Sequence, residues 1–207
     1  MFNDVLIGLD KWDSYDILYI LVLDNTTMGI DKVGILIRQP QKLFHTLDLK
    51  VLWGVKNQNT LYKTISRLLK KGILISVQKG LYSLVPLDQL EAAEIGFRAI
   101  NHFSYLSTES ILSKNGIINQ SPARITFVSS MPANFNINGN DYLVRQLKPK
   151  FLNNSLGVIQ NDRGMLAATT ERAIADMVYF QPNYHFDADR VIDWNLVKNY
   201  QQQIGYL

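Results

Sequence analysis

Short polar and basic side chains gather in one stretch of the chain, and their chemistry is that of nucleic-acid binding. Amides and hydroxyls can hydrogen-bond to base edges in the major groove, and ammonium groups pair with phosphates. We expect these side chains at the start and along one face of a helix over residues 57–70, and in the turn of the hairpin that follows it. The candidates are Lys56, Asn57, Gln58, Asn59, Thr60, Tyr62, Lys63, Ser66, Lys70, Gln78 and Lys79.

The charge of the chain is concentrated around these candidates. The formal net charge is +3, but residues 39–85 contain eight Lys or Arg against a single acid, Asp48. Both flanking segments carry more acids than bases. A phosphate backbone attracts such a segment, whereas a lysine-rich face can also be merely solvated, and helical units of this kind also dock proteins. We favour DNA because amides, helix lysines and the turn lysine are expected to converge on one side.

The elements that would position these residues can be predicted from periodicity. Apolar residues recur at offsets of four, seven and eight in the helix, at Leu61, Ile65, Leu68 and Leu69. Asn57 begins a polar cluster suited to the N-cap, and Gly72 is suited to the C-terminal end. Two β-prone runs, residues 73–77 and 81–85, are separated by a turn at 78–80.

The preceding residues complete the pattern of a winged helix-turn-helix. Residues 31–38 predict a helix that ends before Pro40, and residues 42–46 a short edge strand. Asp48 is the expected N-cap of a short helix through Trp53, and residues 54–56 form the turn into the next helix. Further upstream, residues 15–23 fit a helix or a buried strand, with the helix favoured.

The second half predicts alternating helices and strands. Residues 87–100 indicate a helix that links the two halves, and Ser107 is the expected cap of a helix over 108–114 that ends at Gly116. Strands are expected at 124–129, 142–147 and 157–159, with a turn at 138–140 between the first two. Thr169 or Thr170 begins a helix through residue 180, with Ala173, Ile174, Met177 and Val178 as its buried stripe.

A last helix is expected from Asp193, with a buried stripe at Leu196, Val197, Tyr200 and Ile204. The predicted fold class is therefore α+β, with an N-terminal winged helix-turn-helix and a C-terminal mixed α/β domain. The predicted domains are residues 1–88 and 89–207. Because each has its own apolar stripes, fragments cut between them are expected to separate two activities.

Composition restricts the cellular setting. The chain has no cysteine, which excludes disulfides and thiolate metal sites. Its N-terminus has acids where a signal peptide has positive charge, and its longest apolar run, residues 17–23, is far below the ~20 residues of a membrane span. We expect a cytoplasmic protein without a membrane partner.

Few residues suggest catalysis. The three histidines are isolated, and no Gly-rich phosphate loop, HExxH or GxSxG motif is present. Glu171 and Asp176 are five residues apart on one helix and so point about 140° away from each other, whereas Arg172 and Asp176 are spaced for an ion pair. We expect no enzyme, cofactor or metal. A divergent metal-dependent nuclease that uses Asp162, Glu171 and a lysine is the open alternative.

A second basic cluster surrounds Pro149 and consists of Arg145, Lys148 and Lys150. It lies on an expected strand and the loop after it. Three interpretations stay open from the sequence: a second phosphate-binding surface, a face that meets an acidic partner, and a solvated loop.

Several of these segments together resemble the AbiEi-type antitoxins of abortive-infection toxin-antitoxin systems. They are RLLKKGIL, KGLYSLV, YLSTESILSKNGII, ITFVSS and ATTERAIADMV, and the resemblance covers roughly residues 30–205. It implies that the winged helix binds inverted repeats in its own promoter as a repressor, and that the C-terminal domain counters a nucleotidyltransferase-class toxin. Residues 1–30 have no counterpart with a known role. A winged-helix transcriptional regulator unrelated to a toxin is the alternative.

Overall fold

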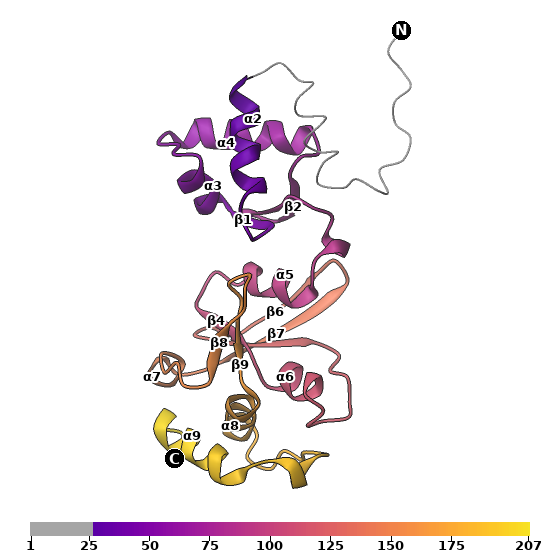
Figure 1. Ribbon diagram of the computed structural model, residues 1–207, viewed down its shortest axis with the longest axis vertical. Helices are drawn as coiled ribbons and strands as arrows, with labels where there is room; N and C mark the ends of the chain where they lie inside the picture. The colour runs from indigo at the N-terminus through magenta and orange to yellow at the C-terminus, as the bar shows by residue number, and fades with distance from the viewer. Residues whose placement is uncertain (1–26) are drawn as a thin grey trace.

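The protein is an α+β structure with two separate sheets. The computed structural model describes the backbone of residues 27–207 and the side chains of residues 32–207. A three-stranded sheet and its helices lie at one end of an elongated molecule, and a six-stranded sheet with its helices lies at the other (Figure 1). The helix or strand expected over residues 15–23 lies outside the described residues.

The smaller unit alternates short strands with helices. Its elements are α2 (Thr27–Ile37), β1 (Leu43–His45), α3 (Thr46–Leu52), α4 (Gln58–Lys70), β2 (Ile75–Gln78) and β3 (Leu81–Ser83). The strand order is β1-β3-β2, and both pairs are antiparallel. Trp53 ties α3 to α2, because its indole N–H donates to the Lys32 carbonyl at 3.0 Å.

The prediction for α4 is confirmed. Asn57 is the N-cap, and its Oδ1 accepts from the backbone N–H groups of Asn59 at 2.8 Å and Thr60 at 3.2 Å. Gly72 has a φ of +69°, and the N–H of Ile73 donates to the Leu68 carbonyl at 3.0 Å, as at many helix ends. The buried face consists of Leu61, Thr64, Ile65 and Leu68, with Leu69 only half-buried.

Other boundaries in this unit differ from the predictions. Helix α2 begins at Thr27 rather than at residue 31, and the two hairpin strands are shorter than the apolar runs that predicted them. Asp48 is not the cap of α3. It lies three residues after the N-cap, His45, and its carboxylate accepts the His45 backbone N–H at 2.8 Å. A carboxylate three residues after the N-cap can reach back to the N-cap N–H, which has no partner within the helix.

The larger unit is built on a mixed sheet in the order β6-β7-β5-β4-β9-β8. Pairs β5–β7 and β4–β9 are parallel, and the others are antiparallel. The strands are β4 (Ser104–Leu106), β5 (Ile125–Ser129), β6 (Ala133–Ile137), β7 (Asn140–Gln146), β8 (Val158–Gln160) and β9 (Leu166–Ala168). The helices are η1 (Leu87–Gln89), α5 (Ala92–Ala99), α6 (Glu109–Lys114), α7 (Pro149–Leu152), α8 (Thr170–Phe180), η2 (Asp189–Val191) and α9 (Trp194–Ile204).

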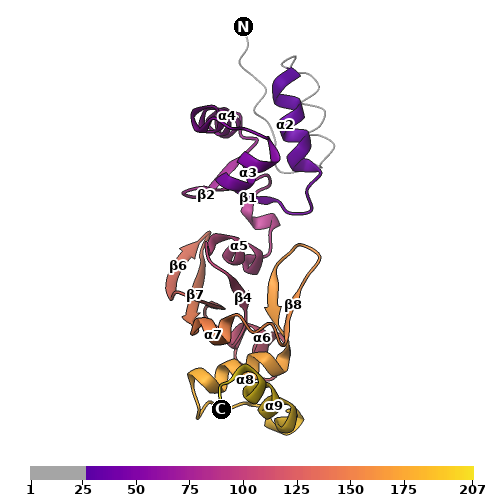
Figure 2. The same ribbon diagram turned by 90° about the vertical axis from the view of Figure 1, so that its left-hand side faces the viewer.

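Helices cover both faces of this sheet. Helix α5 packs on β4 and β5 on the side that faces the smaller unit, whereas α6 and α8 lie on the other side and α9 packs on α8 (Figure 1 and Figure 2). Predicted caps of two helices are confirmed: Thr169 Oγ1 accepts the Arg172 N–H, and Asp193 Oδ1 accepts the Leu196 N–H. Leu196 itself is 37% exposed, so its place in the predicted stripe is wrong.

Three expectations for the larger unit are corrected. The expected helix over 87–100 is broken, because a 3-10 turn ends at Gln89 and Leu90 and Glu91 are extended before α5 begins. Ser107 does not cap α6, because its hydroxyl donates to Asp176 at 2.8 Å. The turn at Asn138 and Gly139 joins β7 to β6, a strand that the sequence did not predict, rather than to β5.

The two units share a packed interface. One hydrophobic cluster lies among α2, α3, α4 and the small sheet, and the other fills the larger unit. Leu43 and Leu81, both fully buried strand residues of the small sheet, belong to the second cluster. Gln78 also crosses the boundary, since its Nε2 donates to the Ala99 carbonyl at 2.9 Å. A cut between residues 88 and 89 would therefore expose apolar surface on both fragments.

Gly96 sets the distance between α5 and the large sheet, and its replacement tests this packing. A Cβ at Gly96 would lie 2.3 Å from Tyr142 Cε1 and 2.9 Å from Phe127 Cε2. We predict that Gly96→Ala lowers the free energy of unfolding by about 1–3 kcal/mol, measured by urea titration, because both rings are buried and must shift.

Gly34→Ala in α2 is the matched control. Its Cβ would meet only Arg38 Nη2, at an ordinary 3.6 Å. Since alanine favours helix over glycine by up to about 1 kcal/mol, this variant should be as stable as the wild type or more stable. A Gly96→Ala protein that is also stabilised would contradict the close packing of α5.

Candidate functional site

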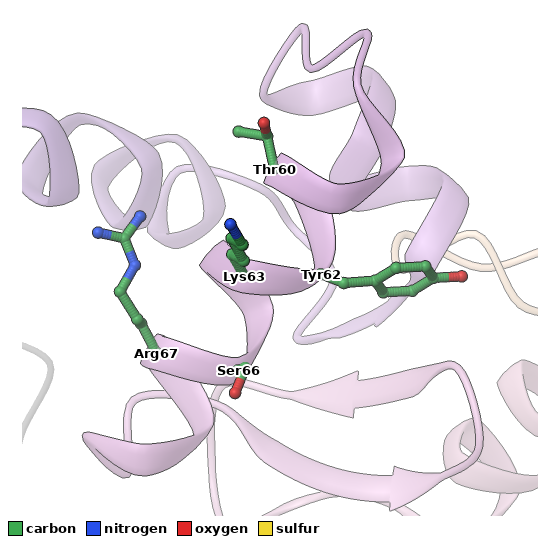
Figure 3. A pocket seen from close by; sticks show the side chains of 5 residues that line it. All are labelled: Thr60, Tyr62, Lys63, Ser66 and Arg67. Atoms are coloured by element: carbon green, nitrogen blue, oxygen red, sulfur yellow. The ribbon is translucent and has the colours of Figure 1, made fainter.

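The exposed face of α4 is the candidate site. Thr60, Tyr62, Lys63, Ser66 and Arg67 line a shallow hollow along the helix. In Figure 3, Thr60, Lys63 and Arg67 point to one side of α4 and Tyr62 points to the other. The opposite face is held in the core by Leu61, Ile65 and Leu68, so packing fixes which residues face outward.

Positive charges follow one another along this face. Lys63, Arg67 and Lys70 are spaced by four and three residues, which places them on the same side of the helix. Within residues 27–207, none of the three forms an ion pair with an acid. Like charges at this spacing repel and destabilise an isolated helix. An anionic partner would remove that repulsion.

Arg67 is a member of this face that the sequence prediction left out. It is not among the binding candidates named from the sequence. Its offset of four from Lys63 was the available signal, because residues four apart are neighbours on a helix surface.

Two of the amides at the start of α4 are already bonded to neighbouring groups of the same helix. The Oδ1 of Asn57 is occupied by capping, so only its Nδ2 is available to a partner. Gln58 Nε2 donates to the Tyr62 hydroxyl at 3.0 Å. Lys56, Asn59 and Thr60 are exposed beside them. The first turn therefore presents donors and acceptors in fixed positions.

Gln78 and Lys79, the two candidates from the hairpin, lie outside the hollow on α4. Gln78 is half-buried and bonded to α5 through the Ala99 carbonyl, so its amide nitrogen is directed into the interface between the units. Lys79 is exposed in the β2–β3 turn and lines a different cleft, together with residues of α5 and the loop before β4. The hollow on α4 and this cleft share no lining residue.

Two of the three cations in the second basic cluster are exposed. Arg145 on β7 forms an ion pair with Glu109, its side chain is 18% exposed, and its guanidinium lies 5.5 Å from the Phe180 ring centroid. Lys148 and Lys150 are exposed at the start of α7. The Lys150 ammonium lies 4.5 Å from the centroid of the Phe151 ring. Only the two lysines present a surface to a partner.

The expected ion pair between Arg172 and Asp176 is present and fully buried. Arg172 Nε lies 2.9 Å from Asp176 Oδ1, and both side chains are 0% exposed. Asp176 also accepts the hydroxyls of Tyr105 at 3.0 Å, Ser107 at 2.8 Å and Tyr206. Burial beside this carboxylate raises the pKa of the Tyr105 hydroxyl, which keeps it a donor.

Arg172 is satisfied on its other side by backbone carbonyls. Its Nη1 donates to the carbonyls of Asn154 at 3.0 Å and Leu156 at 2.9 Å, and its Nη2 donates to the Tyr105 hydroxyl at 2.8 Å. Every polar group of the pair is thus occupied, so this cluster is a structural centre and not a binding surface.

The remaining acids do not form a metal-binding group in the described part of the chain. Glu171 lies in the first turn of α8, and Asp162 is exposed in the turn between β8 and β9. Across residues 27–207, no three His, Cys, Asp or Glu side chains are grouped closely enough to hold an ion.

Neither a family model nor a curated protein matches this chain. In the part of the chain that the structure describes, no helix combines the length and the apolar character needed to span a bilayer.

The buried ion pair makes a testable contribution to stability. We predict that Asp176→Asn lowers the free energy of unfolding by about 3–5 kcal/mol in urea titration, because it leaves Arg172 charged and unpaired in the core. Asp162→Asn removes the same charge from an exposed turn and should change it by no more than about 0.5 kcal/mol. Equal effects of the two substitutions would contradict the structural role of Asp176.

Proposed function

We propose that this chain is a DNA-binding transcriptional repressor whose unit from α2 to β3 is a winged helix-turn-helix. In this proposal α3 and α4 form the helix-turn-helix, α4 is the recognition helix and the β2–β3 hairpin is the wing. The observation that carries the proposal is the outward face of α4, where Lys63, Arg67 and Lys70 lack ion-pair partners within residues 27–207.

The arrangement of α4 supports base contacts by its first turn and phosphate contacts by the residues that follow. Recognition helices of this class contact base edges with their N-terminal residues. Asn59 and Thr60 are exposed in the first turn of α4, where they can reach the groove floor. Lys63, Arg67 and Lys70 follow on the same helix and are suited to phosphates on either side of the groove.

The phosphate contacts can be tested by salt dependence. We predict that Lys63→Ala, Arg67→Ala and Lys70→Ala each weaken binding to the DNA upstream of the gene and to random DNA alike. Each should also flatten the plot of log affinity against log salt concentration by about one unit of slope. Asn59→Ala and Thr60→Ala should instead alter sequence preference, by about 1–3 kcal/mol for each good contact.

Lys114→Ala is the control for this series, because Lys114 is exposed at the end of α6 in the other unit. It should leave both affinity and salt slope unchanged. If the three α4 variants bind random DNA as the wild type does at low salt, α4 is not the DNA-binding surface.

We further propose that the protein is an antitoxin of the AbiEi type, on the basis of the sequence resemblance. It would repress its own promoter by binding inverted repeats there, and its larger unit would counter a nucleotidyltransferase-class toxin. This role requires the cytoplasm and no catalysis, cofactor or metal. The exposed Lys148 and Lys150 are the cations in the larger unit that we assign to the toxin-facing surface.

Substitution in the intact chain is the suitable test of the antitoxin role. Fragments are unsuitable because Leu43 and Leu81 are buried against the larger unit. We predict that Lys148→Glu with Lys150→Glu, expressed from an unrelated promoter, reduces protection of cells against the toxin and leaves promoter binding unchanged. Arg145 should stay intact because its ion pair with Glu109 is structural.

Lys63→Ala supplies the reciprocal control, since it should weaken DNA binding and preserve protection. Full protection by the double lysine variant would remove the toxin-facing assignment. Promoter binding without any protection by the wild type would favour the alternative, a winged-helix regulator unrelated to a toxin. No feature of the site favours a nuclease that uses Asp162 and Glu171.

A further inference from the structure

A cleft separates the β2–β3 turn of the smaller unit from the end of α5 and the start of β4. It has a volume of about 580 Å³ and is lined by residues of both units. This size lies within the roughly 300–1,000 Å³ typical of pockets for small ligands. None of the lining residues belongs to α4, so an inference from this cleft is independent of DNA binding by that helix.

The cleft is positively charged. Lys79 lies on one wall, and Arg98 lies on the other. Within residues 27–207, neither Lys79 nor Arg98 has an ion-pair partner, although Arg98 is half-buried. Asp48 is the acid among the lining residues, and one of its carboxylate oxygens already accepts the His45 backbone N–H. A partly desolvated, unpaired guanidinium favours an anionic ligand, and phosphate matches its fork of donors.

A further side chain points to the rest of the ligand. Phe103 lines the same cleft and remains 50% exposed, so part of its ring is accessible to a ligand. Stacking on an aromatic ring is a sequence-tolerant way to bind a nucleobase.

We propose that this cleft binds a nucleoside phosphate. Arg98 and Lys79 bind the phosphate, and Phe103 stacks on the base. A free nucleotide fits a concave site enclosed from two sides better than the backbone of a duplex does. Because both units contribute to the site, the ligand bridges them.

Isothermal titration calorimetry of the full chain tests this proposal. The probes are ATP, GTP, CTP and UTP, with adenosine and inorganic phosphate as partial ligands. At least one triphosphate should bind, and each partial ligand should bind about tenfold or more weakly, because it lacks either the charge-assisted contacts or the stacking. Arg98→Gln should weaken the nucleotide by about tenfold, as should Phe103→Ala, and thermal unfolding establishes that both variants are folded.

Lys198→Gln is the matched control, because it removes one positive charge from an exposed position on α9. It should leave nucleotide affinity unchanged. The absence of binding by all four triphosphates overturns the proposal, as does undiminished affinity in folded Arg98→Gln. Phosphate that binds as tightly as the nucleotides overturns the role of the base. Reduced duplex affinity in Arg98→Gln without nucleotide binding means instead that the cleft continues the DNA-binding surface.

Discussion

The buried ion pair between Arg172 and Asp176 is the interaction on which the larger unit depends. Asp176 holds Tyr105 and Ser107 at the end of β4 and Tyr206 near the C-terminus, while Arg172 holds the backbone that leads into β8. Strand β4, the segment before β8, helix α8 and the chain end are thereby fixed around one charge pair. The large sheet packs against α5, and α5 contacts the smaller unit. Leu43 and Leu81 of the smaller unit belong to the same hydrophobic cluster.

Local signals were sufficient for the elements that begin and end on distinctive residues. Asn57, Thr169 and Asp193 cap their helices as predicted, and Gly72 and Gly116 adopt positive φ where helices were expected to end. Strands β4, β6 and β9 were not predicted. Strand β4 is buried throughout and has no alternation, and β6 is mostly exposed. Their existence depends on neighbours distant in sequence, which periodicity cannot reveal.

The candidate site, like the fold, was predictable from the sequence only in part. Helical spacing predicted the exposed side of α4, because amphipathicity determines which residues face outward. It could not predict that Gln58 donates to the Tyr62 hydroxyl, that Gln78 bonds to Ala99, or that Arg145 pairs with Glu109. The cleft beside Lys79 was also beyond the sequence. Its walls come from segments far apart in the chain, from His45 to Leu166, that meet only through tertiary packing.

If α4 lies in the major groove at a defined promoter site, directed DNA cleavage will locate it there. The chain has no cysteine, so Ser66→Cys on the exposed face of α4 introduces a single attachment point for an iron chelate. We predict cleavage confined to a few neighbouring base pairs of the promoter, and none from the same chelate at Lys198→Cys on α9. Uniform cleavage along the fragment, or equal cleavage from both positions, would contradict it.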